Sequence, residues 1–286
     1  MSTISCAIHR LHPAQRDDIG DLVTRRPLPG PDLDHLGAFL FLNHHGPQVY
    51  PAPNRGLPFG PHPHRGFETV TFILDGELTH RDTGGHESTI YAGGVQWMTA
   101  GSGLIHAEIS SEAFKQAGGR LEILQLWVNL PARLKMTAPR YTGVQADAVP
   151  VLVEDEGRVH VHLVAGSRGG ATGPVDSLTG VFMSFAHLAP GGTLAIDGLG
   201  GRDVFLYIVR GAVSIAGQVA PAFHLAELVP GERLELTAQE DSVILLGHTE
   251  PIAEPIVAHG PFVMNSVAEI HQAYADFRAG AFGTMG

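Results

Sequence analysis

Between Thr69 and Leu130 the chain consists of short runs in which apolar and polar residues alternate. β-branched and aromatic residues are frequent in these runs, and turn pairs such as Asp75-Gly76 and Gly93-Gly94 separate them. Alternation with a period of two is typical of strands that bury one face. The pattern predicts antiparallel strands at residues 69–74, 77–81, 87–91, 95–99, 104–109 and 121–130.

A second series of short strands follows a break in the pattern. Between Pro131 and Pro150 the alternation lapses into a proline-bearing stretch of mixed polarity, as expected where one domain ends. Beyond it, apolar runs predict further strands at residues 159–164, 181–188 and 204–209. The sequence therefore predicts two domains, spanning residues 1–135 and 136–286.

The two halves look like degenerate copies of one unit. Aligning the turn glycines Gly76 and Gly211 pairs the run 69–74 with the run 204–209. Dense antiparallel strands of this kind close into a sandwich or barrel. The expected fold class is all-β, with two tandem barrels.

Helical periodicity is expected only near the C-terminus. Ser266 followed by Glu269 forms a capping box, and three apolar residues recur at helical spacing after it: Ile270, Tyr274 and Phe277. A short amphipathic helix that packs on a barrel follows from this pattern. Residues 37–50 show little apolar continuity and are expected to form a surface loop.

Composition narrows the classes of function. The chain has 286 residues, enough for two domains with separate cores. Acidic residues number 29 against 18 basic ones, and the basic residues form no runs, which argues against direct nucleic-acid binding. There is one cysteine, no signal-peptide pattern, and no apolar run near the roughly 20 residues that span a membrane. We expect a soluble, cytoplasmic monomer.

Two short pairs of residues point to metal chemistry. His62-Pro-His64 places two imidazoles two residues apart, so an extended strand would present both on one face. His106-Ala-Glu108 repeats this spacing with an imidazole and a carboxylate. Three imidazoles and one carboxylate suit iron, zinc, copper or nickel, whereas calcium and magnesium prefer oxygen ligands. We therefore expect these four residues to bind one transition-metal ion.

Two alternatives to this ligand set remain open. Glu68 lies four residues past His64, about 13 Å along an extended strand, so it reaches the same ion only if Arg65-Gly66 bends the chain. Glu108, two residues from His106, needs no such bend and is favoured. Elsewhere, His160-Val-His162 has the same spacing but no carboxylate on a nearby matching strand, and the chain has 17 histidines, so chance pairs are expected.

The residues around the ligands resemble a known family. Gly56, His62-x-His64 and Glu68 are spaced as in the first cupin motif, and Gly101-Ser-Gly103-Leu-Ile-His106 resembles the second. Four longer runs are similar to pirins: Pro61-His-Pro-His-Arg-Gly-Phe-Glu-Thr-Val-Thr71, Val95-Gln-Trp-Met-Thr-Ala-Gly-Ser-Gly-Leu-Ile-His106, Leu126-Trp-Val-Asn-Leu-Pro131 and His259-Gly-Pro-Phe-Val-Met-Asn265. One departure is Asn43-His44-His45, where pirins usually carry Asp followed by a bulky apolar residue, and it affects the expected entrance to the pocket.

The resemblance implies a bicupin with one iron ion in the N-terminal barrel and none in the C-terminal barrel. Other divalent transition metals would also suit the ligands. By alignment of the turns, the positions equivalent to the ligands and to Glu68 in the second barrel are Asp197, Leu199, Asp203, Ile244 and Leu246. These residues cannot build the same site.

The resemblance also implies a function. Some pirins act as quercetin 2,3-dioxygenases, so the expected activity is a metal-dependent dioxygenase whose substrates are dioxygen and a flavonol or related small aromatic molecule. In that reaction Glu108 would be catalytic: it would bind iron and, on swinging off the metal, would accept the proton of the flavonol 3-hydroxyl. The alternative is an iron-dependent regulator that binds a transcription factor or a metabolic enzyme. The third hypothesis is that the metal is purely structural and that the activity of the protein lies elsewhere.

Overall fold

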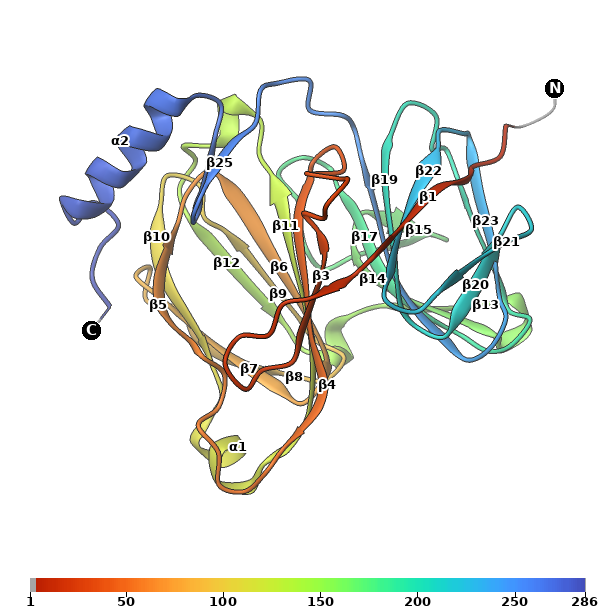
Figure 1. Cartoon of the computed structure of the whole chain (residues 1–286), viewed down its shortest axis with the longest axis horizontal. Helices are drawn as coiled ribbons and strands as arrows, with labels where there is room; N and C mark the ends of the chain where they lie inside the picture. Colours follow the sequence, from red (N-terminus) through yellow and green to blue (C-terminus); the bar gives the residue numbers. More distant parts are fainter. Residues whose placement is uncertain (1–3, 286) are drawn as a thin grey trace. The chain divides into compact units, whose positions relative to one another are not determined.

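The computed structural model describes residues 4–285 and consists mostly of β-strands, with two α-helices (Figure 1). The chain forms two compact units. The N-terminal barrel contains Arg16–Arg25, Leu40–Asp147 and the chain from Ile252 onward, and the C-terminal barrel contains the chain up to Gln15, Arg26–Phe39 and Ala148–Pro251. The all-β fold with a short C-terminal helix is confirmed.

These units differ from the expected division into residues 1–135 and 136–286. Strand β1 (Ala7–Pro13) pairs antiparallel with β22 (His224–Val229), so the N-terminal strand belongs to the C-terminal barrel. The C-terminal helix in turn belongs to the N-terminal barrel. Pairing between segments more than 200 residues apart leaves no local signal in the sequence, and periodicity could not have revealed it.

Two sheets form the N-terminal barrel. Apolar residues from both sheets, such as Ile73, Leu78 and Ile123, pack together as a core. The four-stranded sheet has the order β5 (Phe59–His64), β10 (Leu104–Ile109), β7 (Glu77–Asp82), β8 (Glu87–Tyr91). The seven-stranded sheet has the order β12 (Arg140–Val144), β9 (Val95–Thr99), β6 (Phe67–Asp75), β11 (Gly119–Asn129), β4 (Phe39–Tyr50), β3 (Thr24–Leu28), β2 (Gln15–Arg16), and its last three strands include some residues that belong to the C-terminal unit. The six strands expected in this half are confirmed, whereas the helix α1 (Glu112–Ala117) was not predicted.

The expected surface loop at residues 37–50 is wrong, because β4 occupies most of that stretch and is largely buried. Burial on both faces removes the alternation that marks a half-buried strand. Its histidines are paired inside the protein: His44 Nε2 lies 2.9 Å from Glu122 Oε1, and His45 Nδ1 lies 2.9 Å from Thr24 Oγ1. The departure from the usual pirin residues at this point therefore places a buried polar pair in the sheet.

The C-terminal barrel repeats the same plan. Its seven-stranded sheet has the order β1, β22, β19 (Asp203–Arg210), β24 (Ser242–Thr249), β17 (Phe182–Leu188), β14 (Val159–Ala165), β13 (Val151–Glu154). Its four-stranded sheet has the order β18 (Thr193–Asp197), β23 (Arg233–Ala238), β20 (Ala212–Ile215), β21 (Gln218–Pro221). A short hairpin, β15 (Ser167–Arg168) and β16 (Ala171–Thr172), adjoins them in sequence. The three strands expected in this half are confirmed as β14, β17 and β19.

The predicted C-terminal helix is α2 (Val267–Arg278), which lies beside the hairpin of β25 (Val257–His259) and β26 (Phe262–Met264) (Figure 1). The capping box is present, since Ser266 Oγ accepts a hydrogen bond from the Glu269 amide at 3.3 Å. Ile270 and Ala273 pack with Phe262. None of the helices in residues 4–285 is both long enough and apolar enough to cross a membrane.

Candidate metal centre

Three histidines meet where two strands of the N-terminal barrel pair. Strands β5 and β10 run antiparallel, and His106 is the register partner of His62. His64 lies two residues further along β5, so all three imidazoles share one face of the sheet. One ligand atom from each of the three residues lies within 4.8 Å of the others. Within residues 4–285 no other such group of three or more histidine, cysteine or acidic ligand atoms is present.

The free nitrogen atoms of these rings fit a metal ion. The Nδ1 atom of His62 donates to the Gly60 carbonyl at 2.8 Å, and Nδ1 of His64 donates to the Pro261 carbonyl at 3.2 Å. Each ring therefore keeps an Nε2 lone pair. Both nitrogens of His106 are buried without a hydrogen-bond partner, a costly arrangement that a metal ligand would explain.

The protonation state also favours metal binding. Burial, reinforced by the neighbouring His62, lowers the pKa of His64 to about 3. Burial and the three surrounding histidines hold the pKa of His106 well below its usual value. Both rings are therefore neutral at physiological pH, and the neutral imidazole is the form that binds metals.

Glu108 is held close to this cluster but is hydrogen-bonded elsewhere. It lies on β10 two residues after His106 and is buried. Its Oε1 accepts a hydrogen bond from Thr71 Oγ1 at 3.1 Å, and its Oε2 accepts one from the side-chain amide of Gln125. The carboxylate is not among the converging ligand atoms of the three histidines. Its role as fourth ligand stays a prediction.

Glu68, the alternative fourth ligand, belongs to the other sheet. The chain bends at Gly66, where φ is +88°, and passes from β5 into β6. Glu68 is fully buried there, and its Oε1 accepts a hydrogen bond from Thr99 Oγ1 at 2.6 Å. Burial raises the pKa of this carboxyl, which the Thr99 bond only partly offsets. Because metal ligands must be deprotonated, a carboxyl with a raised pKa is the poorer candidate for a metal ligand.

Sequence reasoning missed a polar group beside the cluster. His80 lies on β7, which pairs with β10, and its ring centroid is 5.4 Å from that of His106. Its ring stacks on Tyr141 at 3.9 Å, and its Nε2 lies 2.9 Å from Asp82 Oδ2. The alternation of the predicted strand 77–81 would have placed His80 on a defined face, but only the register with β10 brings it to the metal ligands.

An aromatic wall flanks His64 on its other side. The ring centroids of Phe67 and Trp127 lie 5.1 and 5.3 Å from that of His64, both edge-on. Phe41 stacks on Trp127 at 4.6 Å. These rings come from three strands of the seven-stranded sheet. Phe67 is fully buried, whereas Phe41 and Trp127 are partly exposed and supply an apolar surface beside His64 that a flat organic molecule could contact.

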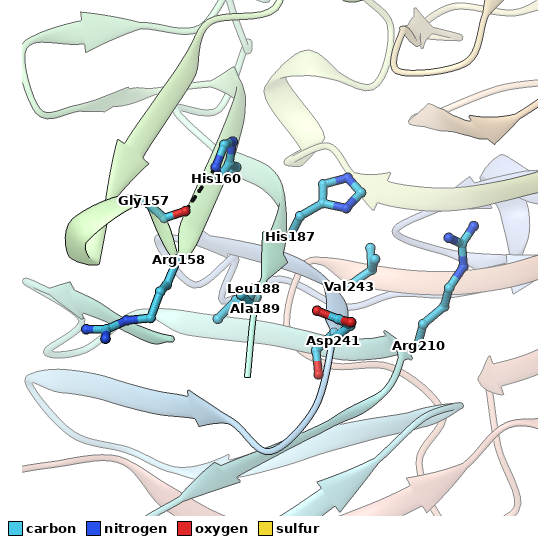
Figure 2. Close-up of a pocket in the computed structure, with 10 residues that line it drawn as sticks. Gly157, Arg158, His160, His187, Leu188, Ala189, Arg210, Asp241 and Val243 are labelled. Atoms are coloured by element: carbon cyan, nitrogen blue, oxygen red, sulfur yellow. Dashed lines mark hydrogen bonds between the residues drawn. The ribbon is translucent and has the colours of Figure 1, made fainter. Parts of the chain in front are cut away.

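The second histidine pair with the same spacing forms no comparable site. His160 lies on β14 and donates to the Gly157 carbonyl at 3.2 Å, and it lines a pocket with His187 of the neighbouring strand β17 (Figure 2). His162 instead stacks on Phe185 at 4.3 Å. Basic side chains of Arg158 and Arg210 line that pocket as well, but the histidines of β14 and β17 are not part of a converging ligand group.

The positions in the C-terminal barrel that match the metal ligands are mostly apolar. Leu199, Ile244 and Leu246 belong to its buried core. Asp197 forms an exposed ion pair with Arg233. The C-terminal barrel therefore has mainly apolar side chains at the positions where the N-terminal barrel has its histidine ligands.

Two barrels, one of them with a converging histidine trio, define the class of metal-binding bicupins. Two family models match the chain. The Pirin model matches residues 21–128, and the model of the Pirin C-terminal cupin domain matches residues 184–283. The chain belongs to the pirin family.

Relatives cover most of the chain. A Pseudomonas aeruginosa protein named "Putative quercetin 2,3-dioxygenase" is 40% identical over 250 residues, which is 87% of each chain. A pirin-like protein of Caulobacter vibrioides is 40% identical over 226 residues, covering 78% of this chain and 80% of its own. The solved structure of a quercetin 2,3-dioxygenase from Acinetobacter baumannii is similar with a TM-score of 0.92 and 34% identity, over 99% of this chain and 100% of that one.

Proposed function

We propose that this pirin binds one iron ion per chain through His62, His64, His106 and Glu108 and acts as a dioxygenase of the quercetin 2,3-dioxygenase type. The single observation that carries the proposal is His106, a fully buried imidazole whose two nitrogens both lack a hydrogen-bond partner. The similarity to proteins named as quercetin 2,3-dioxygenases supports the reaction class.

The metal, when bound, would supply the open coordination positions and redox chemistry that bring a flavonol and dioxygen together. The residues of the chain have separate tasks. Phe41 and Trp127, which are partly exposed, offer an apolar surface for a planar substrate, which also limits the access of water to the ligands. Glu108 accepts the proton of the flavonol 3-hydroxyl, and Thr71 and Gln125 orient its carboxylate for that transfer.

Quercetin turnover tests this function. Iron-loaded protein mixed with quercetin and oxygen is expected to remove the flavonol absorbance, and Glu108→Gln is expected to reduce the rate by roughly 100-fold or more, as for loss of a general base. The matched control is Glu112→Gln, an exposed glutamate of the same barrel, 82% accessible, whose loss should leave the rate unchanged. No turnover by fully iron-loaded protein would contradict the proposal and favour the alternative role as a regulator with a protein partner.

A further inference from the structure

A second cavity is lined by residues of the C-terminal barrel alone, and none of them is a predicted metal ligand. Its volume is about 440 Å³, within the range of roughly 300–1,000 Å³ that small-ligand pockets occupy. Phe182 of β17 and Ile196 of β18 give it an apolar side. Arg202 and His248 give it a polar side.

Arg202 and His248 form a hydrogen-bonded pair with a defined direction. The Nε atom of Arg202 lies 2.8 Å from Nδ1 of His248. A guanidinium can only donate, so Nδ1 accepts and the proton of the neutral ring sits on Nε2. Burial, reinforced by the Arg202 charge, lowers the pKa of His248 to about 4, and the ring is therefore neutral at pH 7. Phe182 stacks on the imidazole at 4.8 Å and 6° and fixes its plane.

The charges around the cavity leave Arg202 uncompensated. Arg168 also lines the cavity, but Glu154 neutralises it through two hydrogen bonds of 2.7 Å. Asp197, whose side chain is 69% exposed, pairs with Arg233, whose NH1 lies 2.7 Å from Oδ1 and which also pairs with Glu235. Among residues 4–285 no carboxylate forms an ion pair with Arg202. The cavity thus presents the Arg202 guanidinium and one imidazole N–H donor, and its one lining carboxylate, Asp197, pairs with Arg233.

We propose that this cavity binds a small organic carboxylate with an apolar body. Its carboxylate would accept hydrogen bonds from the Arg202 guanidinium and from Nε2 of His248, a charge-assisted arrangement with two donors. The apolar body would lie against Phe182 and Ile196. The site shares no residue with the predicted iron centre and does not depend on the proposed oxygenase activity.

Calorimetric titration of iron-loaded, full-length protein with benzoate tests the site. Benzoate is expected to bind with one-to-one stoichiometry, and neutral benzamide should bind at least about tenfold more weakly, since charge-assisted hydrogen bonds carry the affinity. Arg202→Gln is expected to weaken benzoate binding by a similar factor. Arg202→Lys, which keeps the charge but not the planar fork, should give an intermediate affinity. Circular dichroism checks that each variant is folded.

Three comparisons locate the binding. Arg10→Gln removes another arginine of the same barrel, one paired with Asp32, and should leave benzoate affinity unchanged. His106→Ala disrupts the predicted iron centre and should also retain benzoate binding. The His248 side-chain resonances should shift with benzoate in nuclear magnetic resonance spectra.

Four results would overturn the proposal. They are an unchanged affinity in folded Arg202→Gln, loss of benzoate binding in His106→Ala, inorganic phosphate binding as tightly as benzoate, and no benzoate binding at millimolar concentration.

Discussion

The Gln125→Leu substitution removes a hydrogen bond that holds the carboxylate of Glu108. Gln125 lies on β11 and donates to Glu108 Oε2, while Thr71 donates to Oε1 at 3.1 Å. Leucine has a similar volume and no donor. Loss of an outer partner of a metal ligand typically costs 10–100-fold in metal affinity or activity. Because Thr71 still donates to one oxygen of Glu108, we expect a loss at the lower end of this range. Iron affinity should fall about tenfold, which corresponds to about 1.4 kcal/mol.

Anaerobic competition with an iron(II) chelator measures this affinity. The matched control is Gln145→Leu in the same barrel, where the lost amide donates to the Thr89 carbonyl at 2.8 Å and not to Glu108. Urea unfolding of both variants separates a metal effect from a general loss of stability. Iron affinity in folded Gln125→Leu equal to that of the unchanged protein, or an equal loss in Gln145→Leu, would refute the positioning role.

Two further predictions concern buried carboxyls. Glu122→Ala should lower the free energy of unfolding by about 1–3 kcal/mol, because it removes the buried 2.9 Å contact between Glu122 Oε1 and His44 Nε2. Glu87→Ala, at an exposed ion pair with Arg81, should cost about 0–1 kcal/mol in the same urea experiment, and equal costs would refute the argument. Glu68→Gln should stabilise the protein at pH 7. Since burial raises the pKa of Glu68, the folded state disfavours its charged form, and stability falls as pH rises through the folded value. Thermal unfolding should show the gain vanish below pH of about 4, and a gain that grows as pH falls would contradict it.

The strands of the N-terminal barrel could be predicted because turn residues bound short runs rich in β-branched and aromatic residues, and β8 and β9 lie at the expected residues. The histidine trio could be predicted because a spacing of two on a strand fixes the face of each side chain. β4 was missed because it is buried on both faces. The pairing of β1 with β22 was missed because periodicity does not reveal which strands pair. The same limit hid His80, which only the pairing of β7 with β10 brings near His106.

Strand spacing favours Glu108 over Glu68 as the fourth metal ligand. The side-chain contacts of the two glutamates bear on the same question. The bend at Gly66 that Glu68 required is present, but it carries Glu68 into the other sheet. Glu108 stays on the strand of His106, but both of its oxygens accept hydrogen bonds from protein groups. Such contacts depend on residues that are far apart in the chain, so spacing alone could not have predicted them.

The metal content of the purified chain tests the central claim most directly. After anaerobic loading with iron(II), elemental analysis should find one iron per chain, and His106→Ala should lose it, because a remnant of the ligand set binds far more weakly. The matched control is His160→Ala, which removes a histidine from the other pair with the same spacing and should retain full iron. Two ions per chain, undiminished iron in folded His106→Ala, or loss of iron in His160→Ala would contradict the assignment.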